Sequence, residues 1–404
     1  MIAPMLSRLP QRLERRHVAV LILGLAASAV TIAVARAQQP AGAATAMFVY
    51  FGTYTGEKSQ GIYRARLDLA AGTVSEPELA ATVTSPSFLA LAPDKRHLYA
   101  ANEMGKFGDK PTGAVSAFAI DRATGALTLL NQESSGGSGP AHVSVDRAGR
   151  TVLVANYGGG SVASLPIGTD GRLGPAASVI VHQGSSVHPK RQTKPYAHSI
   201  NMDTSNTFAY AADLGVDRIF IYRLDPKTSA LTPATPASVA LTPGSGPRHL
   251  SFHPGGRFAY VINELALTVT VFTRDATSGA LTEVQSISTL PAGQALDPAF
   301  STAEVVVHPS GKFLYGSNRG HDSLVVFAID QATGKLTLVQ HVPTQGKTPR
   351  GFGVDPTGRY LLAGNQQSDS VVVFRIDATS GRLTPTGQTL KVGSPVSVVF
   401  VPVN

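Results

Sequence analysis

One phrase of residues recurs six times along this chain at a spacing of roughly 50 residues, and this period limits the architectures that the chain can adopt. Each phrase begins near a proline, runs through a short apolar strand, turns at Pro/Asp-x-Gly and continues into a second strand. Residues 246–264, GPRHLSFHPGGRFAYVINE, show it most clearly. The second strands end in Asn or Asp, at Asn102, Asn156, Asp213, Asn263, Asn318 and Asn365.

Two further strands follow each phrase. Residues 114–121, AVSAFAID, have the alternating pattern of a β-strand. Residues 123–128, ATGALT, place a glycine turn before the next strand. Residues 323–330 and 332–337 repeat this pattern. Alternating runs joined by a Gly turn are typical of β-hairpins. Each repeat is therefore predicted to form four antiparallel strands, which is the blade of a β-propeller.

The two ends of the chain supply a seventh repeat in two pieces. Residues 393–402, GSPVSVVFVP, read as a first strand without its partner, and residues 48–54, FVYFGTY, read as a second strand without its predecessor. Pairing the two would close the ring and remove exposed strand edges. We predict an all-β fold, a seven-bladed β-propeller of four-stranded antiparallel blades, as one domain over residues 47–404.

Residues 1–37 have the pattern of a signal peptide. Five arginines and one glutamate precede or flank the uncharged, mostly apolar run 18–35, and Ala35-Arg36-Ala37 fits a cleavage site for small residues. An uncleaved anchor is the alternative, because the run has nearly the length needed to span a bilayer. Residues 38–46 read as a short linker. The sequence thus predicts export to the periplasm or the medium, with membrane contact only if the leader is retained.

Composition excludes several kinds of site. The leader holds half of the formal charge of +8, no dense Lys/Arg stripe follows it, and there is no tryptophan, so nucleic-acid binding is not expected. The chain has no cysteine, which excludes disulfides, thiolate metal sites and a cysteine nucleophile.

Polar residues gather where the first strand of each repeat begins. In a propeller these strands line the central channel, and we assign one common register to seven residues counted back from the turns: Phe88, His142, His198, His249, Glu304, Gly351 and Ser397. Arg248 and Arg350 stand just before two of them. Packing alone does not explain why this register varies between repeats, so we expect a binding or catalytic site at one mouth of the channel.

The ends of the second strands lie at the same mouth, because the first two strands of a blade are antiparallel. Glu264, Arg319 and Asp213 occupy these ends. The long basic segment 181–196, VHQGSSVHPKRQTKPY, leads into the strand of His198 and contains Arg191, a cation suited to an anionic substrate. The Asn residues at the other second-strand ends are expected to bond nearby backbone groups instead.

Several of these phrases together resemble the lactonase-type seven-bladed propellers, the family of bacterial 6-phosphogluconolactonase and fungal carboxymuconate-lactonising enzyme. The resemblance covers nearly all of residues 47–404. It rests on YFGTY at 50–54, His198-Ser199 with Asp213-Leu214-Gly215, GPRH at 246–249 with Asn263-Glu264-Leu265, Ala303-Glu304 with SNRGHDS at 317–323, and Asn365-Gln366.

The resemblance implies hydrolysis of a sugar-acid lactone or a related carboxylated lactone, with His198, Glu264, Arg248 and Arg319 as catalytic residues. Opening a lactone requires a base for water, a donor for the oxyanion and a cation for the substrate's negative group. Either His198 or Glu264 could be the base. The family commonly has a second histidine two residues before the one matching His198, where this chain has Tyr196.

We expect a small-molecule lactone or an anionic sugar derivative as the partner. Six further residues are predicted to bind it: His142, His249, Glu304, Arg350, Asp213 and Arg191. No cofactor is expected, although a metal held by His142, His198, His249 and Glu304 is an alternative. The alternative function is that of a non-catalytic exported propeller that binds a carbohydrate, a peptide or an envelope component.

Overall fold

The computed structural model describes residues 45–403. The predicted signal peptide over residues 1–37 lies outside the described residues, as does most of the predicted linker over 38–46. The first strand begins at Ala46, one residue before the predicted start of the propeller. Within residues 45–403, no helix has both the length and the hydropathy required to cross a membrane.

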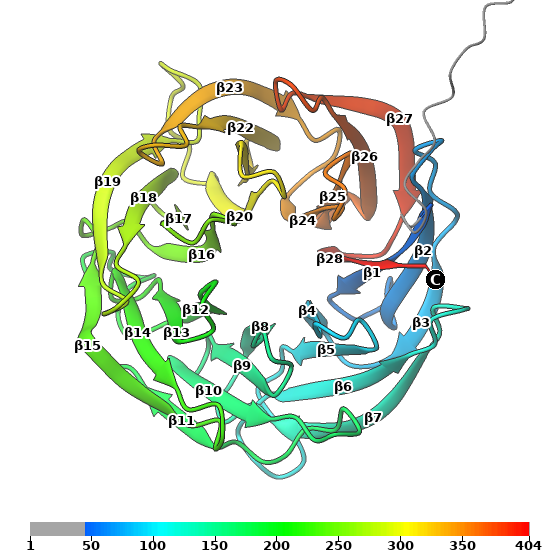
Figure 1. The fold of residues 1–404 in the computed structure, drawn as a ribbon. Helices are drawn as coiled ribbons and strands as arrows, with labels where there is room; N and C mark the ends of the chain where they lie inside the picture. Colours follow the sequence, from blue (N-terminus) through cyan, green and yellow to red (C-terminus); the bar gives the residue numbers. More distant parts are fainter. Residues whose placement is uncertain (1–44, 404) are drawn as a thin grey trace, which may run out of the picture. The chain divides into compact units, whose positions relative to one another are not determined.

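Seven four-stranded antiparallel sheets are arranged in a ring, which confirms the predicted all-β propeller (Figure 1). The innermost strands are β4 (Pro86–Leu91), β8 (Pro140–Val145), β12 (Ala197–Met202), β16 (Pro247–Phe252), β20 (Ser301–Val307), β24 (Pro349–Val354) and β28 (Pro395–Pro402). The second strands are β5 (His97–Asn102), β9 (Thr151–Asn156), β13 (Phe208–Asp213), β17 (Phe258–Asn263), β21 (Phe313–Arg319), β25 (Tyr360–Asn365) and β1 (Ala46–Thr53).

The two outer strands of each blade complete the sheets. The third strands are β6 (Ala114–Ile120), β10 (Ser161–Pro166), β14 (Arg218–Leu224), β18 (Thr268–Arg274), β22 (Ser323–Ile329), β26 (Ser370–Ile376) and β2 (Gly61–Asp68). The outermost are β7 (Leu127–Ser134), β11 (Ser178–Val181), β15 (Leu231–Ala240), β19 (Leu281–Ser288), β23 (Leu336–Pro343), β27 (Leu383–Lys391) and β3 (Glu78–Thr82). A 3-10 turn, η1 (Gln366–Ser368), follows β25.

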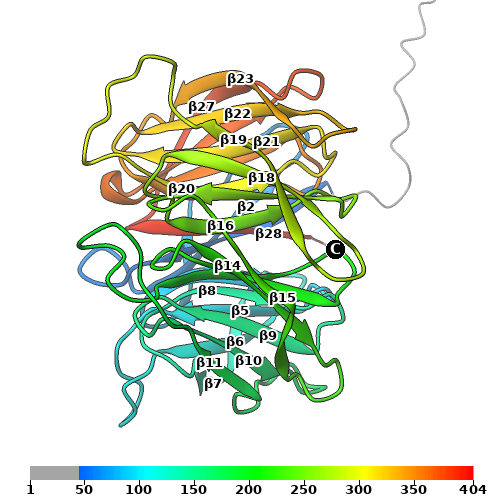
Figure 2. The same cartoon turned by 90° about the vertical axis from the view of Figure 1, so that its left-hand side faces the viewer.

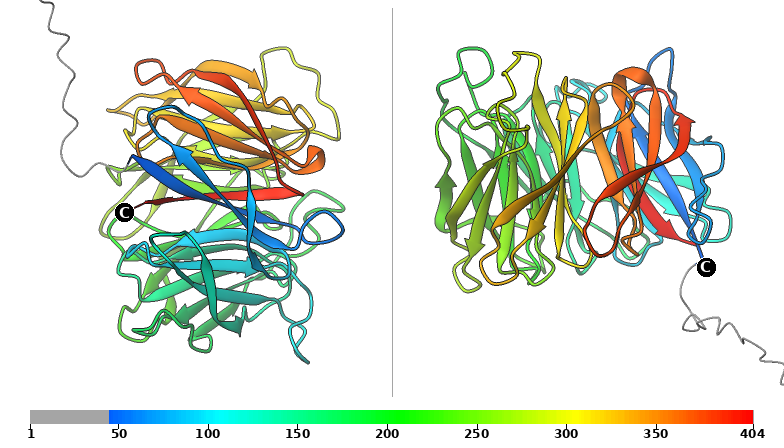
Figure 3. Two further views of the ribbon diagram at one scale, coloured as in Figure 1. Left: turned by 90° about the vertical axis from the view of Figure 1, so that its right-hand side faces the viewer. Right: turned by 90° about the horizontal axis from the view of Figure 1, so that it is seen from above.

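The ring closes as the sequence predicts. β28 pairs antiparallel with β1, from Met47 opposite Pro402 to Gly52 opposite Ser397, so both ends of the propeller share one blade (Figure 1). Side views show the strands of every blade running between the two faces of the ring (Figures 2 and 3). The first strand therefore begins on the face where the second strand ends.

Neighbouring blades are joined by a recurring contact that the sequence reading did not predict. A buried tyrosine of one second strand donates a hydrogen bond to the carbonyl of the Gly that turns between the third and fourth strands of the next blade. Tyr50 bonds Gly125 in this way at 2.7 Å, and Tyr210 bonds Gly279 at 2.7 Å. Gly125 needs its positive φ of 74°, and a Cβ there would meet the Phe48 ring at 2.7 Å. Such contacts tie five of the seven blades to the next one.

Candidate active site

A β-bulge near the start of the first strands decides which side chains reach the mouth of the channel. In β16, Pro247 pairs with Asn263 and His249 with Ile262, so that Arg248 is the extra residue. Bulges re-aim the side chain that they leave unpaired. The equivalent extra residues are Ser87 in β4, Ala141 in β8, His198 in β12 and Arg350 in β24.

This pairing corrects the register assigned to His198. Ala197 pairs with Asp213 and Ser199 with Ala212, so Ser199, and not His198, shares the position of His142 and His249. His198 instead occupies the bulge position of Arg248 and Arg350. Asp203 and His253 begin equivalent turns, and the residues four positions before them are Ser199 and His249. His198 therefore lies one position before the common register. The other six residues of the predicted register keep their common position.

The aromatic side chains meet in the middle of the channel. The His249 ring lies 5.3 Å from that of His142 and 5.2 Å from that of His198, between ring centroids, and the Phe88 and His142 rings are 4.3 Å apart. His249 Nδ1 is 2.9 Å from Glu304 Oε1. The sequence therefore identified residues that do converge, although they lie at two levels along the channel.

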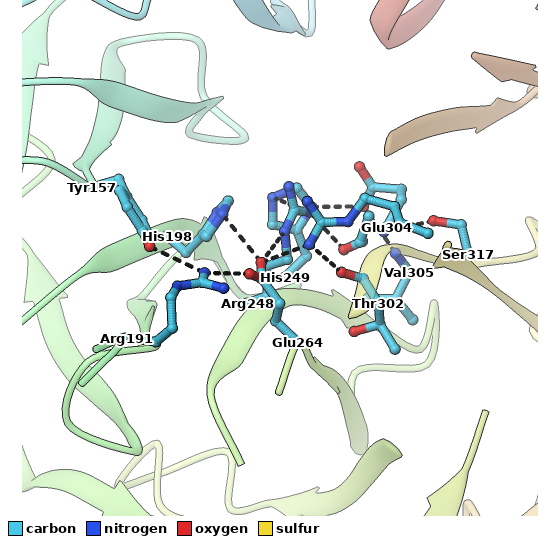
Figure 4. A network of polar contacts seen from close by, with 12 residues as sticks. Tyr157, Arg191, His198, Arg248, His249, Glu264, Thr302, Glu304, Val305 and Ser317 are labelled. Atoms are coloured by element: carbon cyan, nitrogen blue, oxygen red, sulfur yellow. Dashed lines mark hydrogen bonds and ion pairs between the residues drawn. The ribbon is translucent and has the colours of Figure 1, made fainter. Parts of the chain in front are cut away.

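Glu264, directly after β17, is the centre of the polar network at the mouth (Figure 4). Its Oε2 accepts a hydrogen bond from Arg248 Nε at 3.0 Å and forms an ion pair with Arg319 Nη2 at 3.0 Å. Its Oε1 forms a short ion pair with Arg191, which also donates to the Tyr157 hydroxyl at 3.3 Å. Four separate segments of the chain thus meet at one carboxylate.

The charge of Glu264 is strongly stabilised. Burial alone disfavours the ionised carboxylate, but the guanidinium groups of Arg319, Arg248 and Arg191 outweigh burial and lower the pKa of Glu264 to about 2. A carboxylate with so low a pKa is a poor proton acceptor near neutral pH. Glu264 therefore suits electrostatic stabilisation better than the role of general base.

His198 has the opposite character. Burial lowers its pKa well below the ordinary value for histidine, and the charge of Arg248 adds to this effect, so the imidazole is neutral near pH 7. His198 Nε2 lies 3.9 Å from Glu264 Oε2, a separation at which one water molecule can contact both atoms. Its Nδ1 is buried without a hydrogen-bond partner among residues 45–403. A neutral imidazole beside a fixed carboxylate can accept a proton.

These groups line a polar cavity of about 230 Å³ at the channel mouth. Its lining residues are Glu103, Ala141, Tyr157, Arg191, His198, Glu264, Ser301, Arg319 and Arg350. Hereafter we call it the mouth cavity.

Arg350 differs from the other arginines of the mouth cavity. It lies over the Tyr54 ring at 5.4 Å from the centroid, and no carboxylate of the described residues comes within ion-pair distance of it. Tyr54 in turn donates a hydrogen bond to Glu103 Oε2 at 2.7 Å. Burial opposes the charge of Arg350, but Tyr54, Glu103 and Glu264 outweigh burial and raise its pKa. Arg350 therefore presents a charged guanidinium that a bound anion can reach.

The predicted site residues divide into two groups. His198, Glu264, Arg319, Arg191 and Arg350 line the mouth cavity. The rest do not: Arg248 is buried beneath Glu264, His142, His249 and Glu304 lie deeper in the channel, and Asp213 is fully buried outside it.

Asp213 has a structural role. One oxygen accepts hydrogen bonds from the backbone of Tyr196 and Gly215, at 2.7 and 2.9 Å. The other pairs with His182 Nδ1 at 2.7 Å, and His182 also contacts the Tyr222 hydroxyl at 2.8 Å. This network anchors the basic segment 181–196, so Asp213 positions the strand of His198 instead of contacting a ligand.

Tyr54, Glu103 and Tyr157 were not assigned to the site from the sequence. Each directly follows the second strand of its blade, at the position that Glu264 occupies after β17. This shared position was the available signal. The Thr or Asn before each of them has the structural role and bonds a nearby backbone carbonyl.

The metal alternative requires three or more ligands facing one point. Within residues 45–403, no group of three His, Asp or Glu side chains is arranged to hold a metal ion. His249 Nδ1 is already bonded to Glu304, and the His142 and His198 rings surround His249 edge to face. His249 is thus held within its own network, and the metal alternative stays a prediction.

Comparison with known proteins places this geometry in a family. The family model described as "Lactonase, 7-bladed beta-propeller" matches residues 48–400. A 6-phosphogluconolactonase of Bacillus subtilis is 38% identical over 306 residues, which are 76% of this chain and 84% of that protein. A 6-phosphogluconolactonase of Formosa agariphila is 31% identical over 311 residues, 76% of this chain and 86% of that protein.

A solved structure agrees with the sequence relatives. The periplasmic gluconolactonase of Pseudomonas aeruginosa superimposes with a TM-score of 0.83 at 38% sequence identity, over 89% of this chain and 100% of that one. The predicted family resemblance is thus confirmed over almost the whole propeller. This chain belongs to the family of seven-bladed β-propeller lactonases.

Proposed function

We propose that this protein hydrolyses a small lactone in the mouth cavity, by direct attack of water. The observation that carries the proposal is the pair formed by neutral His198 and ionised Glu264, 3.9 Å apart in a cavity that also holds the charged Arg350. These groups supply the base for water and the cation for the substrate's negative group, and Glu264 adds a negative charge that stabilises His198 once it is protonated.

In the proposed reaction, a water molecule between His198 and Glu264 attacks the carbonyl carbon of the lactone. His198 Nε2 takes the proton of the water, and the imidazolium so formed is stabilised by the negative charge of Glu264. When the tetrahedral intermediate collapses, the ring C–O bond breaks and the imidazolium returns its proton to the leaving alkoxide. The product is a hydroxy acid, and His198 is neutral again.

The developing oxyanion needs donors that are not already committed. The Tyr157 hydroxyl accepts a hydrogen bond from Arg191 and has no acceptor for its own hydrogen among the described residues. Tyr157 can therefore donate to the oxyanion, while Arg350 binds a carboxylate, a phosphate or the product's acid group. Arg191, Arg248 and Arg319 are occupied by Glu264 and hold it in place.

The choice of lactone and the location belong to the proposal. The relatives named above make gluconolactone and its 6-phosphate the first candidates. If residues 1–37 direct export, the unphosphorylated sugar lactone is the better candidate, since a phosphorylated metabolite is confined to the cytoplasm. The name of the Pseudomonas aeruginosa neighbour, a periplasmic gluconolactonase, supports this reading.

A hydrolysis assay with gluconolactone, its 6-phosphate and a simple uncharged lactone tests the proposal. We expect His198→Ala to abolish turnover of whichever lactone the wild type opens. His97→Ala, at the first residue of β5 where His97 bonds Asp94, should leave turnover unchanged. Equal rates for the wild type and His198→Ala would overturn the assignment. Binding of a sugar without any hydrolysis by the wild type would favour the non-catalytic alternative.

A further inference from the structure

A chain of hydrogen bonds leaves the mouth cavity and passes through the channel (Figure 4). Arg248 Nε donates to Glu264 at 3.0 Å, and Arg248 Nη1 lies 3.2 Å from His249 Nε2. His249 Nδ1 then meets Glu304 Oε1 at 2.9 Å. A guanidinium can only donate, so His249 Nε2 must accept and His249 Nδ1 must carry the hydrogen that it gives to Glu304. The proton positions of this chain are therefore determined.

Glu304 is the far end of the chain and does not line the mouth cavity. Its Oε1 also accepts a hydrogen bond from the Val305 backbone at 3.0 Å, whereas its Oε2 has no hydrogen-bond partner among residues 45–403. Glu304 lines a second cavity of about 310 Å³, hereafter the far cavity. The far cavity is lined by Phe88, Leu89, Glu304, Val306, Phe352, Gly353, Val354, Pro356, Ser397, Val398, Val399 and Phe400.

The surroundings of Glu304 make its protonation sensitive near neutral pH. Burial raises the pKa of Glu304 to about 7, and the charges of Arg248 on β16 and Arg350 on β24 partly oppose this rise. His142 on β8 and His249 on β16 are the other titratable neighbours, and burial keeps both neutral by lowering their pKa values well below the ordinary range. Of the remaining first strands, β4 and β28 contribute only uncharged side chains to the far cavity, and β12 does not line it.

We propose that Glu304 is a positioning residue for lactone opening, which acts through His249 and Arg248 on the carboxylate of Glu264. This role rests on the proposed function. Among residues 45–403, Arg248 has two side-chain partners besides the Ala303 carbonyl, namely Glu264 and His249. Holding His249 in the tautomer that accepts from Arg248 therefore fixes the guanidinium that orients Glu264 toward His198.

The charge of Glu304 strengthens the hydrogen bond that keeps His249 in this tautomer. An ionised carboxylate accepts a stronger hydrogen bond from His249 than a protonated carboxyl group does. Activity is therefore expected to rise as Glu304 loses its proton. Because Glu304 does not touch the mouth cavity, the effect falls on kcat and leaves KM nearly constant.

Three variants test the role by kcat and KM across a pH series from about 5.5 to 9. Glu304→Gln keeps an acceptor for His249 but cannot titrate, so we expect kcat to stay at the low-pH level of the wild type and to lose its rise near neutral pH. Glu304→Ala removes the acceptor, and kcat should fall at least tenfold with KM changed less than twofold. Val306→Ala, which alters the same far cavity without touching the chain, should keep the wild-type profile.

Nitrogen NMR of the His249 imidazole provides a readout that does not depend on turnover. The wild type and Glu304→Gln should show a single tautomer with the proton on Nδ1, and Glu304→Ala should show a mixture. An unchanged tautomer in Glu304→Ala, or an unchanged kcat profile in both Glu304 variants, overturns the positioning role. A wild type that opens no lactone overturns the proposed function itself. An active wild type whose kcat does not depend on Glu304 overturns only the positioning role.

Discussion

The two halves of the channel are built from the same strands and have opposite surfaces. The mouth cavity is lined almost entirely by charged and polar side chains, and three of them are Glu264 and its partners Arg191 and Arg319. The far cavity is lined by phenylalanines, valines and other apolar residues, and Glu304 is its only charged side chain. The first strands thus carry polar side chains at the mouth cavity and apolar, packed side chains at the far cavity.

The difference has a local cause. Near the mouth, the bulge in each first strand turns one extra side chain into the channel, as with His198 in β12 and Arg350 in β24. The residue after each second strand adds another, such as Glu264. Beyond the bulge the strands return to regular pairing, and alternate side chains such as Phe352 pack between blades. The apolar half of the channel therefore supports the polar half, in which the side chains can differ between blades without disturbing the ring.

The largest effect should come from Glu264→Gln in the mouth cavity. The amide keeps the shape but removes the charge that stabilises the His198 imidazolium and that balances Arg191, Arg248 and Arg319. We expect kcat to fall about a thousandfold, or roughly 4 kcal/mol of transition-state stabilisation. Steady-state kinetics with the best lactone measure this loss.

The same variant should not lose affinity for anions. The three arginines keep their charge, so the product hydroxy acid is expected to bind Glu264→Gln at least as tightly as it binds the wild type, in a calorimetric titration. Glu103→Gln serves as the matched control, because Glu103 lines the same cavity but pairs with Tyr54 instead of the arginines. A Glu264→Gln enzyme with near-normal kcat would show that the polar half is not the catalytic half.

Phe352→Ala probes the apolar half. The Phe352 side chain is buried between blades and borders the far cavity. Its removal should lower the free energy of unfolding by about 3 kcal/mol, the lower end of the range for such truncations because part of the ring already faces a cavity. Chemical denaturation measures the loss. The kcat/KM of the folded enzyme should stay within about twofold of the wild type, and a larger drop would mean that the two halves are not separable.

Glu304→Gln tests the one charged group of the far cavity through stability. Folding raises the pKa of Glu304 to about 7 from an ordinary value of 4.5, so the folded protein binds this proton more tightly than the unfolded chain does. Ionisation therefore costs stability as pH rises from 4.5 to 7, and the cost is complete above pH 7. Glu304→Gln should be more stable than the wild type by about 3 kcal/mol at pH 8 and by less than about 1 kcal/mol at pH 5. Denaturation curves with the same advantage at both pH values would contradict this account.

The fold was predictable because it depends on a repeated signal. The Pro-initiated strands, the Asp or Pro turns and the Gly hairpins each occur in most blades, so an error in one repeat is corrected by the others. Ring closure followed from the complementary fragments at residues 48–54 and 393–402, now paired in β1 and β28. The tyrosine contacts between blades were not predicted, since a hydrogen bond from Tyr210 to Gly279 joins residues in different repeats.

The site was predictable only as a set of residue types at one mouth. The strand starts and strand ends gave His198, Glu264 and Arg350, but His198 was placed level with His249, whereas it is the bulged residue of β12. Nor could it show that Arg248 is buried against Glu264, because ion pairing depends on side-chain direction across two strands. Departures from a repeat indicate where function lies, whereas contacts decide which of those residues meets the ligand.

Tyr54→Phe should give the smallest effect and tests how the mouth cavity keeps Arg350 free. Burial raises the pKa of Tyr54 to about 12, so its hydroxyl remains protonated and donates to Glu103. Phenylalanine keeps the ring beneath Arg350 but releases the Glu103 carboxylate, which can then compete with the substrate for that guanidinium. We expect KM for an anionic lactone to rise about fivefold, near 1 kcal/mol, with kcat unchanged. Adding Glu103→Gln to Tyr54→Phe should restore KM, and a double variant as impaired as the single one would show that Tyr54 acts on the substrate directly and not through Glu103.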